Sequence, residues 1–283
     1  MRWEGRRQSE NIEDRRGMRV SRGGLVGGGI GTLAIALLVY FLGGDPTAVL
    51  QGAGDAPVQQ TNEPYQEGPQ EAQWREQTAV TLADTEDVWS KIFADMGGQY
   101  RAPTLVLYGG AVDSGCGFAE SAMGPFYCPA DQKLYIDLAF YQQMEGQLHA
   151  GGDFARAYVV AHEVGHHVQN LLGIADRVNA EQQRDPGAAN QFSVRLELQA
   201  DCFAGIYANG IQQYGNVLES GDAEEAINAA KAVGDDTLQR SAGRAVVPDS
   251  FTHGSSEQRM RWFSKGFMSG GVDACDTFKA ADL

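Results

Sequence analysis

Two histidines and a glutamate close together are the residues of this chain best suited to metal chemistry. His162, Glu163 and His166 form the pattern His-Glu-Val-Gly-His. Residues four apart on a helix lie on one face within about 6 Å of each other, so both imidazoles can bind a single Zn²⁺ ion. Glu163 lies one step around the helix, where its carboxylate can accept a proton from a water molecule that the metal activates. The pattern predicts a hydrolytic zinc site, and a chance match is the alternative.

A second pair of acidic residues supplies what a catalytic zinc site still lacks. Glu197 and Asp201 are also four residues apart, and two like charges at this spacing destabilise an exposed helix unless a cation lies nearby. Catalytic zinc takes three protein ligands and keeps its fourth position for water. We therefore expect Glu197 to be the third ligand and Asp201 to accept the free ring N–H of a ligating histidine. The alternative is that both acids are solvated surface groups.

Two helices are expected to carry these residues. Residues 153–172 are good helix formers, with Asp153 as the expected N-cap and Gly173 as the stop. Several apolar side chains of this segment fall opposite the two histidines on a helix, namely Ala157, Val160, Val164 and Leu171. The apolar stripe can then face a core while the histidines face a cleft. Residues 193–207 are the second predicted helix.

These motifs resemble those of the gluzincin peptidases. His162-Glu-x-x-His166 followed by Glu197-x-x-Ala-Asp201 is similar to the membrane-associated group related to HtpX and the CAAX-prenyl proteases. The opening Met-Arg-Trp-Glu-Gly-Arg-Arg-Gln-Ser and the later Ala-Asp-Cys-Phe-Ala-Gly resemble more closely a bacterial family of neutral zinc metallopeptidases, and this likeness covers nearly the whole chain. The resemblance implies a gluzincin-like peptidase domain, a Zn²⁺ cofactor and a peptide or protein substrate.

A third motif places one more histidine near the site. The segment Thr252-His-Gly-Ser-Ser-Glu-Gln-Arg259 is similar to the Thr-His-Pro-x-x-x-x-Arg segment of the same relatives. This resemblance implies that His253 lies near the oxyanion of a tetrahedral intermediate, where a hydrogen-bond donor stabilises the negative charge. Gly254 stands where the relatives have proline, which leaves the local turn less restricted. The alternative is a histidine in a surface loop.

The remaining pattern predicts an α+β fold. Apolar residues at helical spacing indicate a helix over residues 88–96, and a stretch rich in alanine and glutamate indicates another over residues 222–233. Residues 104–108 and 133–137 are predicted strands, which we expect to form a small antiparallel sheet. Residues 126–137 are the candidate edge at which an extended peptide would add a strand, and an ordinary hairpin is the alternative.

The N-terminal part of the chain has the pattern of a membrane anchor. Residues 1–22 contain seven arginines against four acids, and residues 23–44 contain no charged residue. An apolar stretch of about 20 residues can cross a bilayer as a helix, and the arginine excess before it favours a cytoplasmic N-terminus. We predict a single-pass protein of the bacterial inner membrane, with a cytoplasmic basic tail, a transmembrane helix, a flexible linker over residues 45–73 and an outer domain over residues 74–283. A cleaved signal peptide is the alternative.

Charge and glycine spacing indicate which partners to expect. The formal net charge is −15, and an acidic body repels phosphate backbones, so nucleic acid is not an expected partner. The lipid bilayer is the expected partner of residues 23–44. The Gly27-x-x-x-Gly31 spacing within that segment can pack two such helices together, which leaves an oligomer open.

All four cysteines follow the predicted membrane segment. Cys116, Cys128, Cys202 and Cys275 would then face an oxidising compartment, in which disulfides persist. Four cysteines allow three pairings, and the sequence alone does not choose among them. We favour Cys116 with Cys128 and Cys202 with Cys275, and buried thiols are the alternative.

Three functions remain in competition. The first is a membrane-anchored zinc metallopeptidase that hydrolyses peptide bonds outside the cytoplasm, with Glu163 as general base. The second is a non-catalytic, outward-facing binding or scaffold domain with a structural zinc site. Glu163 favours the first, because a structural site needs no base. The third is a zinc hydrolase that acts on cell-wall peptides.

Overall fold

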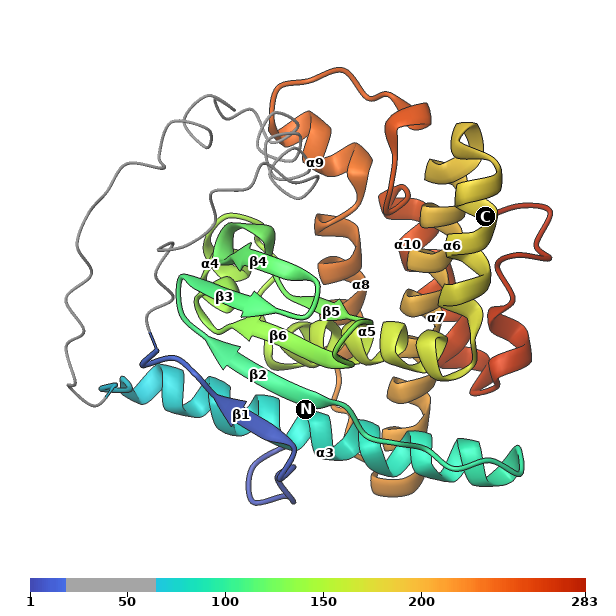
Figure 1. Ribbon diagram of the computed structural model, residues 1–283. Helices are drawn as coiled ribbons and strands as arrows, with labels where there is room; N and C mark the ends of the chain where they lie inside the picture. The colour runs from blue at the N-terminus through green and yellow to red at the C-terminus, as the bar shows by residue number, and fades with distance from the viewer. Residues whose placement is uncertain (19–64) are drawn as a thin grey trace.

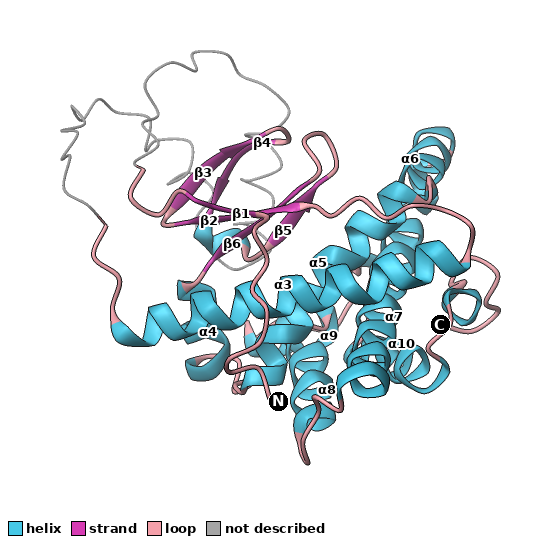
Figure 2. Cartoon of the chain, turned by 90° about the horizontal axis from the view of Figure 1, so that it is seen from below, coloured by secondary structure: helices cyan, strands magenta, loops and turns pink. Residues whose placement is uncertain are grey.

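Helices make up most of the fold, and a small sheet lies on one side of them (Figures 1 and 2). The computed structural model describes residues 1–18 and 65–283. The strands are β1 (Ile12–Asp14), β2 (Thr104–Tyr108), β3 (Ala111–Ser114), β4 (Gly117–Glu120), β5 (Phe126–Cys128) and β6 (Lys133–Asp137). The helices are α3 (Pro69–Asp95), α4 (Ala139–Gly146), α5 (Asp153–Leu171), α6 (Ile174–Arg184), α7 (Ala189–Gly215), α8 (Asp222–Ala232), α9 (Asp235–Ser241) and α10 (Ser256–Ser269). The prediction of an α+β fold is confirmed.

The main sheet is mostly parallel, which corrects the expected antiparallel sheet. Its strand order is β1-β2-β6-β5, with β1, β2 and β6 parallel and only β5 antiparallel to its neighbour. Residues 109–132, which include the separate β3–β4 hairpin, connect β2 to β6. A connection of a dozen residues or more lets the chain return in the parallel direction. An apolar run located β2 and an alternating pattern located β6, but neither fixed the relative direction of the two strands.

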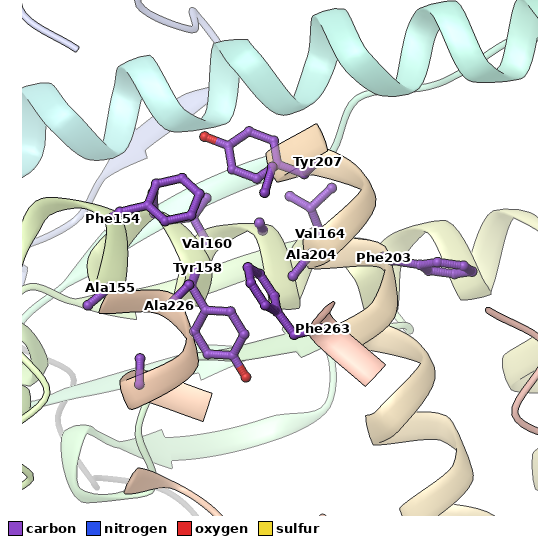
Figure 3. Packing of buried hydrophobic residues seen from close by; sticks show 14 of the residues in the cluster. Phe154, Ala155, Tyr158, Val160, Val164, Phe203, Ala204, Tyr207, Ala226 and Phe263 are labelled. Carbon is purple, nitrogen blue, oxygen red and sulfur yellow. The ribbon is translucent and has the colours of Figure 1, made fainter. Parts of the chain in front are cut away.

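Helix α5 lies at the centre of the fold and contacts α3, α7, α8 and the strands β5 and β6. Figure 3 shows apolar side chains of α5 packed against those of α7, α8 and α10. Phe154, Val160 and Val164 come from α5, and their partners include Ala204 and Tyr207 of α7, Ala226 of α8 and Phe263 of α10. Of the four residues predicted to lie opposite the histidines, three are fully buried and Leu171 is partly buried. The helix begins at Asp153, as predicted, but its N-cap is Gly152. The face of α5 opposite the histidine motif therefore packs in the core.

Helices α7 and α10 pack unusually closely because glycines face each other across the contact. A Cβ added at Gly266 would overlap the carbonyl oxygen of Cys202, and one added at Gly205 would overlap the carbonyl oxygen of Phe263. The Cys202–Cys275 disulfide joins α7 to the segment after α10. These contacts fix α10 against the helix that carries the predicted acidic ligand. Helix α7 is also longer at both ends than the predicted 193–207.

Helix α3 extends well beyond the predicted segment. The expected flexible linker ended at residue 73, and the expected helix covered residues 88–96. In the structure one helix runs from Pro69, with proline in its first turn, and buries Trp74 and Trp89 against the core. Proline is favourable at a helix start, because the missing N–H would have no partner there. The linker prediction is therefore wrong for residues 69–73.

Residues 1–18 pack against the domain, which corrects the predicted separate tail. Strand β1 pairs with β2, and Met1 and Trp3 are buried in the core. The arginines form ion pairs with acids of the domain: Arg6 with Asp84, Arg7 with Glu86 and Asp87, and Arg16 with Glu67 and Glu71. Their partners lie far along the chain, so the sequence pattern alone did not reveal these ion pairs.

The predicted transmembrane helix over residues 23–44 lies outside the described residues, as does the oligomer contact proposed within it. Among the described residues, no helix is long and apolar enough to cross a membrane. Both favoured disulfides, Cys116–Cys128 and Cys202–Cys275, are present.

Candidate metal centre

Two helices bring the three predicted metal ligands to one point. Helix α5 places His162 and His166 one turn apart, with ring centroids separated by 4.9 Å. Helix α7 packs on α5 and presents Glu197 to both rings. The Nε2 atom of His162 lies 3.2 Å from Glu197 Oε2, and the Nε2 atom of His166 lies 3.4 Å from Glu197 Oε1.

These distances fit a tetrahedral zinc site. Ligand atoms about 2.1 Å from zinc and at tetrahedral angles to it are about 3.4 Å apart. The two measured separations match that spacing, and they lie at or beyond the long end of ordinary N–H···O hydrogen bonds, about 3.2 Å. Among the described residues, His162, His166 and Glu197 form a group whose ligand atoms all lie within 4.8 Å of one another. Two imidazoles and one carboxylate are the donor set of a catalytic zinc site with one open position.

A hydrogen bond at the far nitrogen orients each histidine. His162 Nδ1 donates to Asp201 Oδ1 at 2.9 Å, and His166 Nδ1 donates to the side-chain oxygen of Gln169 at 2.9 Å. The amide nitrogen of Gln169 in turn donates to the carbonyl oxygen of Leu196. A hydrogen at Nδ1 leaves the Nε2 lone pair free for the metal, so these partners select the ligating tautomer.

Asp201 belongs to a buried network that reaches a third helix. Arg259 on α10 donates to both carboxylate oxygens of Asp201, at 2.8 and 2.9 Å. The Tyr158 hydroxyl donates to Asp201 Oδ1 at 2.5 Å and accepts from Arg259 at 3.1 Å. Asp201 is fully buried and Arg259 is 4% exposed. The network therefore fixes the orientation of His162 through three helices.

The electrostatic field at the centre favours a cation. Burial lowers the pKa of His162, but the carboxylates of Asp201 and Glu197 outweigh it and raise the pKa to about 10. Burial raises the pKa of Glu197, but the charges of His166 and His253 lower it by more. The pKa of Glu197 therefore lies well below its ordinary range. The negative charge that raises the pKa values of His162 and His166 also attracts a divalent cation, which can replace the protons on the two imidazoles.

Glu163 lies beside the ligands on α5 and is 8% exposed. Burial raises the pKa of its carboxyl group, and the neighbouring His162 and His166 offset only part of that rise. A carboxylate with a raised pKa is a stronger base, as a residue that accepts a proton during a reaction requires. Its position and its pKa suit the general-base role predicted from the sequence.

His253 lies at the margin of the centre and is not among the ligands. Its side chain is 47% exposed and precedes α10 in a loop that Asp235 holds. Partial burial lowers the pKa of His253, while the charge of Glu197 and the hydrogen bond with Asp235 raise it by more. His167 points away from the centre and bonds to the Tyr127 hydroxyl and the Arg101 carbonyl oxygen.

Sequence reasoning gave no role to four residues that shape this site: Tyr158, Gln169, Asp235 and Arg259. Local spacing offered a signal for two of them, because Tyr158 precedes His162 by four residues and Gln169 follows His166 by three. Such positions share a helix face with the ligand. Arg259 ended the motif that contains His253, but nothing in the sequence paired it with Asp201. Asp235 had no local signal.

The His162, His166 and Glu197 group, with Glu163 beside it, is the donor set that a zinc peptidase uses. The family described as "Putative neutral zinc metallopeptidase" matches residues 1–278, and the chain belongs to this family. Zn²⁺ is accordingly its cofactor. The family match agrees with the resemblance predicted from the motifs.

Two relatives have names that state no function. "Uncharacterized protein YpfJ" of Escherichia coli strain K12 is 50% identical over 290 residues, covering 98% of this chain and 99% of the relative. "Uncharacterized protein Rv2575" of Mycobacterium tuberculosis strain H37Rv is 47% identical over 194 residues, covering 65% of each protein. No solved structure matches the chain at a significant level.

Proposed function

We propose that this chain is an active zinc metallopeptidase that hydrolyses peptide bonds. The observation that carries the proposal is the open three-ligand site with Glu163 directly after its first ligand. A structural zinc site has four protein ligands and needs no buried acid beside them. The geometry therefore supports catalysis over a binding or scaffold role.

The proposed reaction adds water across the peptide bond. Zinc, when bound, lowers the pKa of water and polarises the scissile carbonyl. Glu163 accepts a proton from the attacking water as the water oxygen bonds to the carbonyl carbon, and it passes that proton to the leaving nitrogen as the C–N bond breaks. His253 donates a hydrogen bond to the oxyanion that exists between these two events.

The edge strand β5 offers a place for the peptide substrate. It ends the four-stranded sheet, and its outer side pairs with no described strand. It also contacts α5, where the Tyr127 hydroxyl accepts a hydrogen bond from Asn170 at 3.1 Å. A peptide added along this edge gains main-chain hydrogen bonds with little dependence on its side chains. Such binding suits a peptidase of broad specificity.

Zinc dependence is the first test of the proposal. We expect the purified full-length protein to contain one zinc per chain and to cleave members of an unbiased peptide library. A chelator should abolish cleavage, and added zinc should restore it. Glu197→Ala removes a direct ligand and should lower zinc affinity by more than about 100-fold. Loss of a residue that only orients a ligand costs at most about that much. Glu257→Ala, which changes an exposed acid on α10, is the control. Equal zinc affinity in Glu197→Ala and the wild type would exclude the proposed site.

The proposed compartment is the outer side of a bacterial inner membrane, with residues 23–44 as the contact to the bilayer. Two disulfides among the described residues support an oxidising environment. Residues 1–18 must then lie outside too. A Cβ at Gly17 would lie 3.3 Å from the Cβ of Tyr65, and the Arg16 guanidinium stacks 4.9 Å from the centre of the Tyr65 ring. Because these contacts join the two flanks of residues 19–64, the proposal places both flanks on one side of the membrane, in place of the single crossing expected from the sequence.

Cysteine labelling tests this arrangement. The wild-type structure has no free cysteine among its described residues, so it offers no thiol there for a maleimide to label. Glu10→Cys and Asp282→Cys each add one exposed thiol. We expect a membrane-impermeant maleimide to label both variants in intact spheroplasts. If Asp282→Cys is labelled before lysis but Glu10→Cys only after lysis, residues 1–18 and the rest of the domain do not lie on the same side of the membrane. Labelling of both only after lysis would contradict the outer compartment.

A further inference from the structure

Asp235 binds the loop that carries His253 with an unusual number of contacts. One carboxylate oxygen, Oδ2, accepts hydrogen bonds from three successive backbone N–H groups, those of Thr252 at 2.8 Å, His253 at 2.7 Å and Gly254 at 3.0 Å. The Asp235 backbone N–H donates to the Gly254 carbonyl oxygen at 2.9 Å. The carboxylate is 13% exposed. The loop therefore holds a fixed position relative to the start of α9.

The second carboxylate oxygen faces the imidazole itself. Asp235 Oδ1 lies 3.3 Å from His253 Nδ1, and the Thr252 hydroxyl lies 3.0 Å from the same nitrogen. The three backbone bonds would hold the loop without this contact, so loop stability alone does not account for it. An acceptor at Nδ1 favours the ring form that carries a hydrogen there. The carboxylate also favours the doubly protonated ring, in which Nε2 on the opposite edge carries an N–H as well.

We propose that Asp235 is the positioning residue of this site: its carboxylate accepts from His253 Nδ1–H, orients the ring and favours its doubly protonated form, so that Nε2–H can donate to the substrate. The inference rests on the proposed peptidase function only for its effect on cleavage. Its effect on the histidine ring itself is independent of any reaction.

A double-mutant cycle on cleavage is the first arm of the test. Asp235→Asn keeps an oxygen that can accept the backbone N–H groups, but its neutral amide no longer favours the doubly protonated ring and can itself donate to Nδ1. We expect kcat to fall by about 10–100-fold, as when other orienting partners of site histidines are lost, while KM changes less than about twofold. In a His253→Ala background the same substitution should leave kcat unchanged within about twofold, because it would act only through the ring.

Nitrogen NMR on zinc-free, full-length protein labelled with ¹⁵N-histidine is the second arm. The spectrum reports which ring nitrogen of His253 carries hydrogen, and His253→Gln assigns the signal. We expect hydrogen on Nδ1 in the wild type and its loss from Nδ1 in Asp235→Asn. Asp236→Asn is the matched control, since this neighbouring acid on α9 bonds Ser256 and Arg240 and forms no hydrogen bond or ion pair with His253. It should change neither the spectrum nor kcat.

The two arms separate the failure of each idea. If Asp235→Asn leaves the His253 signal unchanged, or if its effect on kcat persists in His253→Ala, Asp235 does not position the ring. If the signal changes as expected while no variant, including the wild type, cleaves any peptide, the positioning stands and the proposed peptidase function falls.

Discussion

Replacing Glu163 with glutamine should leave zinc in place and nearly abolish cleavage. The amide has the size of the carboxylate but cannot accept a proton from water, and general-base catalysis contributes about 10²–10⁴-fold to rate. We therefore expect kcat/KM for a library-derived peptide to fall by at least about 100-fold. Zinc content should stay at the wild-type level, because Glu163 is not part of the His162, His166 and Glu197 donor group.

The measurement pairs steady-state cleavage with zinc content on the same preparation. Glu224→Gln, which makes the same chemical change at an exposed position of α8, is the control and should match the wild type. Loss of zinc in Glu163→Gln would mean that the acid helps to hold the metal. Cleavage at the wild-type rate would remove Glu163 from the mechanism.

The local part of the site could be predicted because helix geometry fixes it. A spacing of four residues on a helix sets two side chains on one face whatever surrounds them. That rule placed His162 beside His166, and it placed Glu197 one turn from Asp201. The contact between the two pairs crosses from α5 to α7. The sequence suggested it only through the chemistry that zinc requires and through the resemblance to known peptidases.

The partners that orient the site could not be predicted, because each depends on packing between distant segments. Arg259 meets Asp201 only because Gly205 and Gly266 let α10 approach α7 closely. Asp235 meets His253 because α9 follows directly after α8 and a loop returns to it. No periodicity in the chain encodes either approach.

The first 18 residues show how one composition can fit two physical explanations. Arginines before an apolar stretch favour a cytoplasmic flank, but the same charges also suit a segment that docks on an acidic helix. Arg6 and Arg7 pair with acids in the middle of α3, and Arg16 pairs with acids near its start. Only the fold reveals that these acids are within reach. Strand β1 was missed for the same reason, since three residues pairing with a distant strand leave little local pattern.

Removing Arg259 should destabilise the protein more than any exposed charge can. Arg259→Leu removes the guanidinium that donates to both oxygens of the fully buried Asp201 carboxylate, and breaking a buried ion pair on one side costs about 3–5 kcal/mol. At about 2–4 °C per kcal/mol for a chain of this size, the melting temperature of the zinc-free protein should fall by about 6–20 °C. Zinc affinity should also fall by about 10–100-fold, because His162 loses the fixed orientation that Asp201 gives it.

Two comparisons make that expectation specific to the buried pair. Arg261→Leu, two residues along α10, removes an exposed arginine paired with Glu257 and should change stability by less than about 1 kcal/mol. Adding Asp201→Asn to Arg259→Leu should recover part of the lost stability, since no uncompensated charge then remains buried. If Arg259→Leu melts at the wild-type temperature, the carboxylate of Asp201 does not depend on this arginine. The orientation of His162 would then rest on Tyr158 and Asp201 alone.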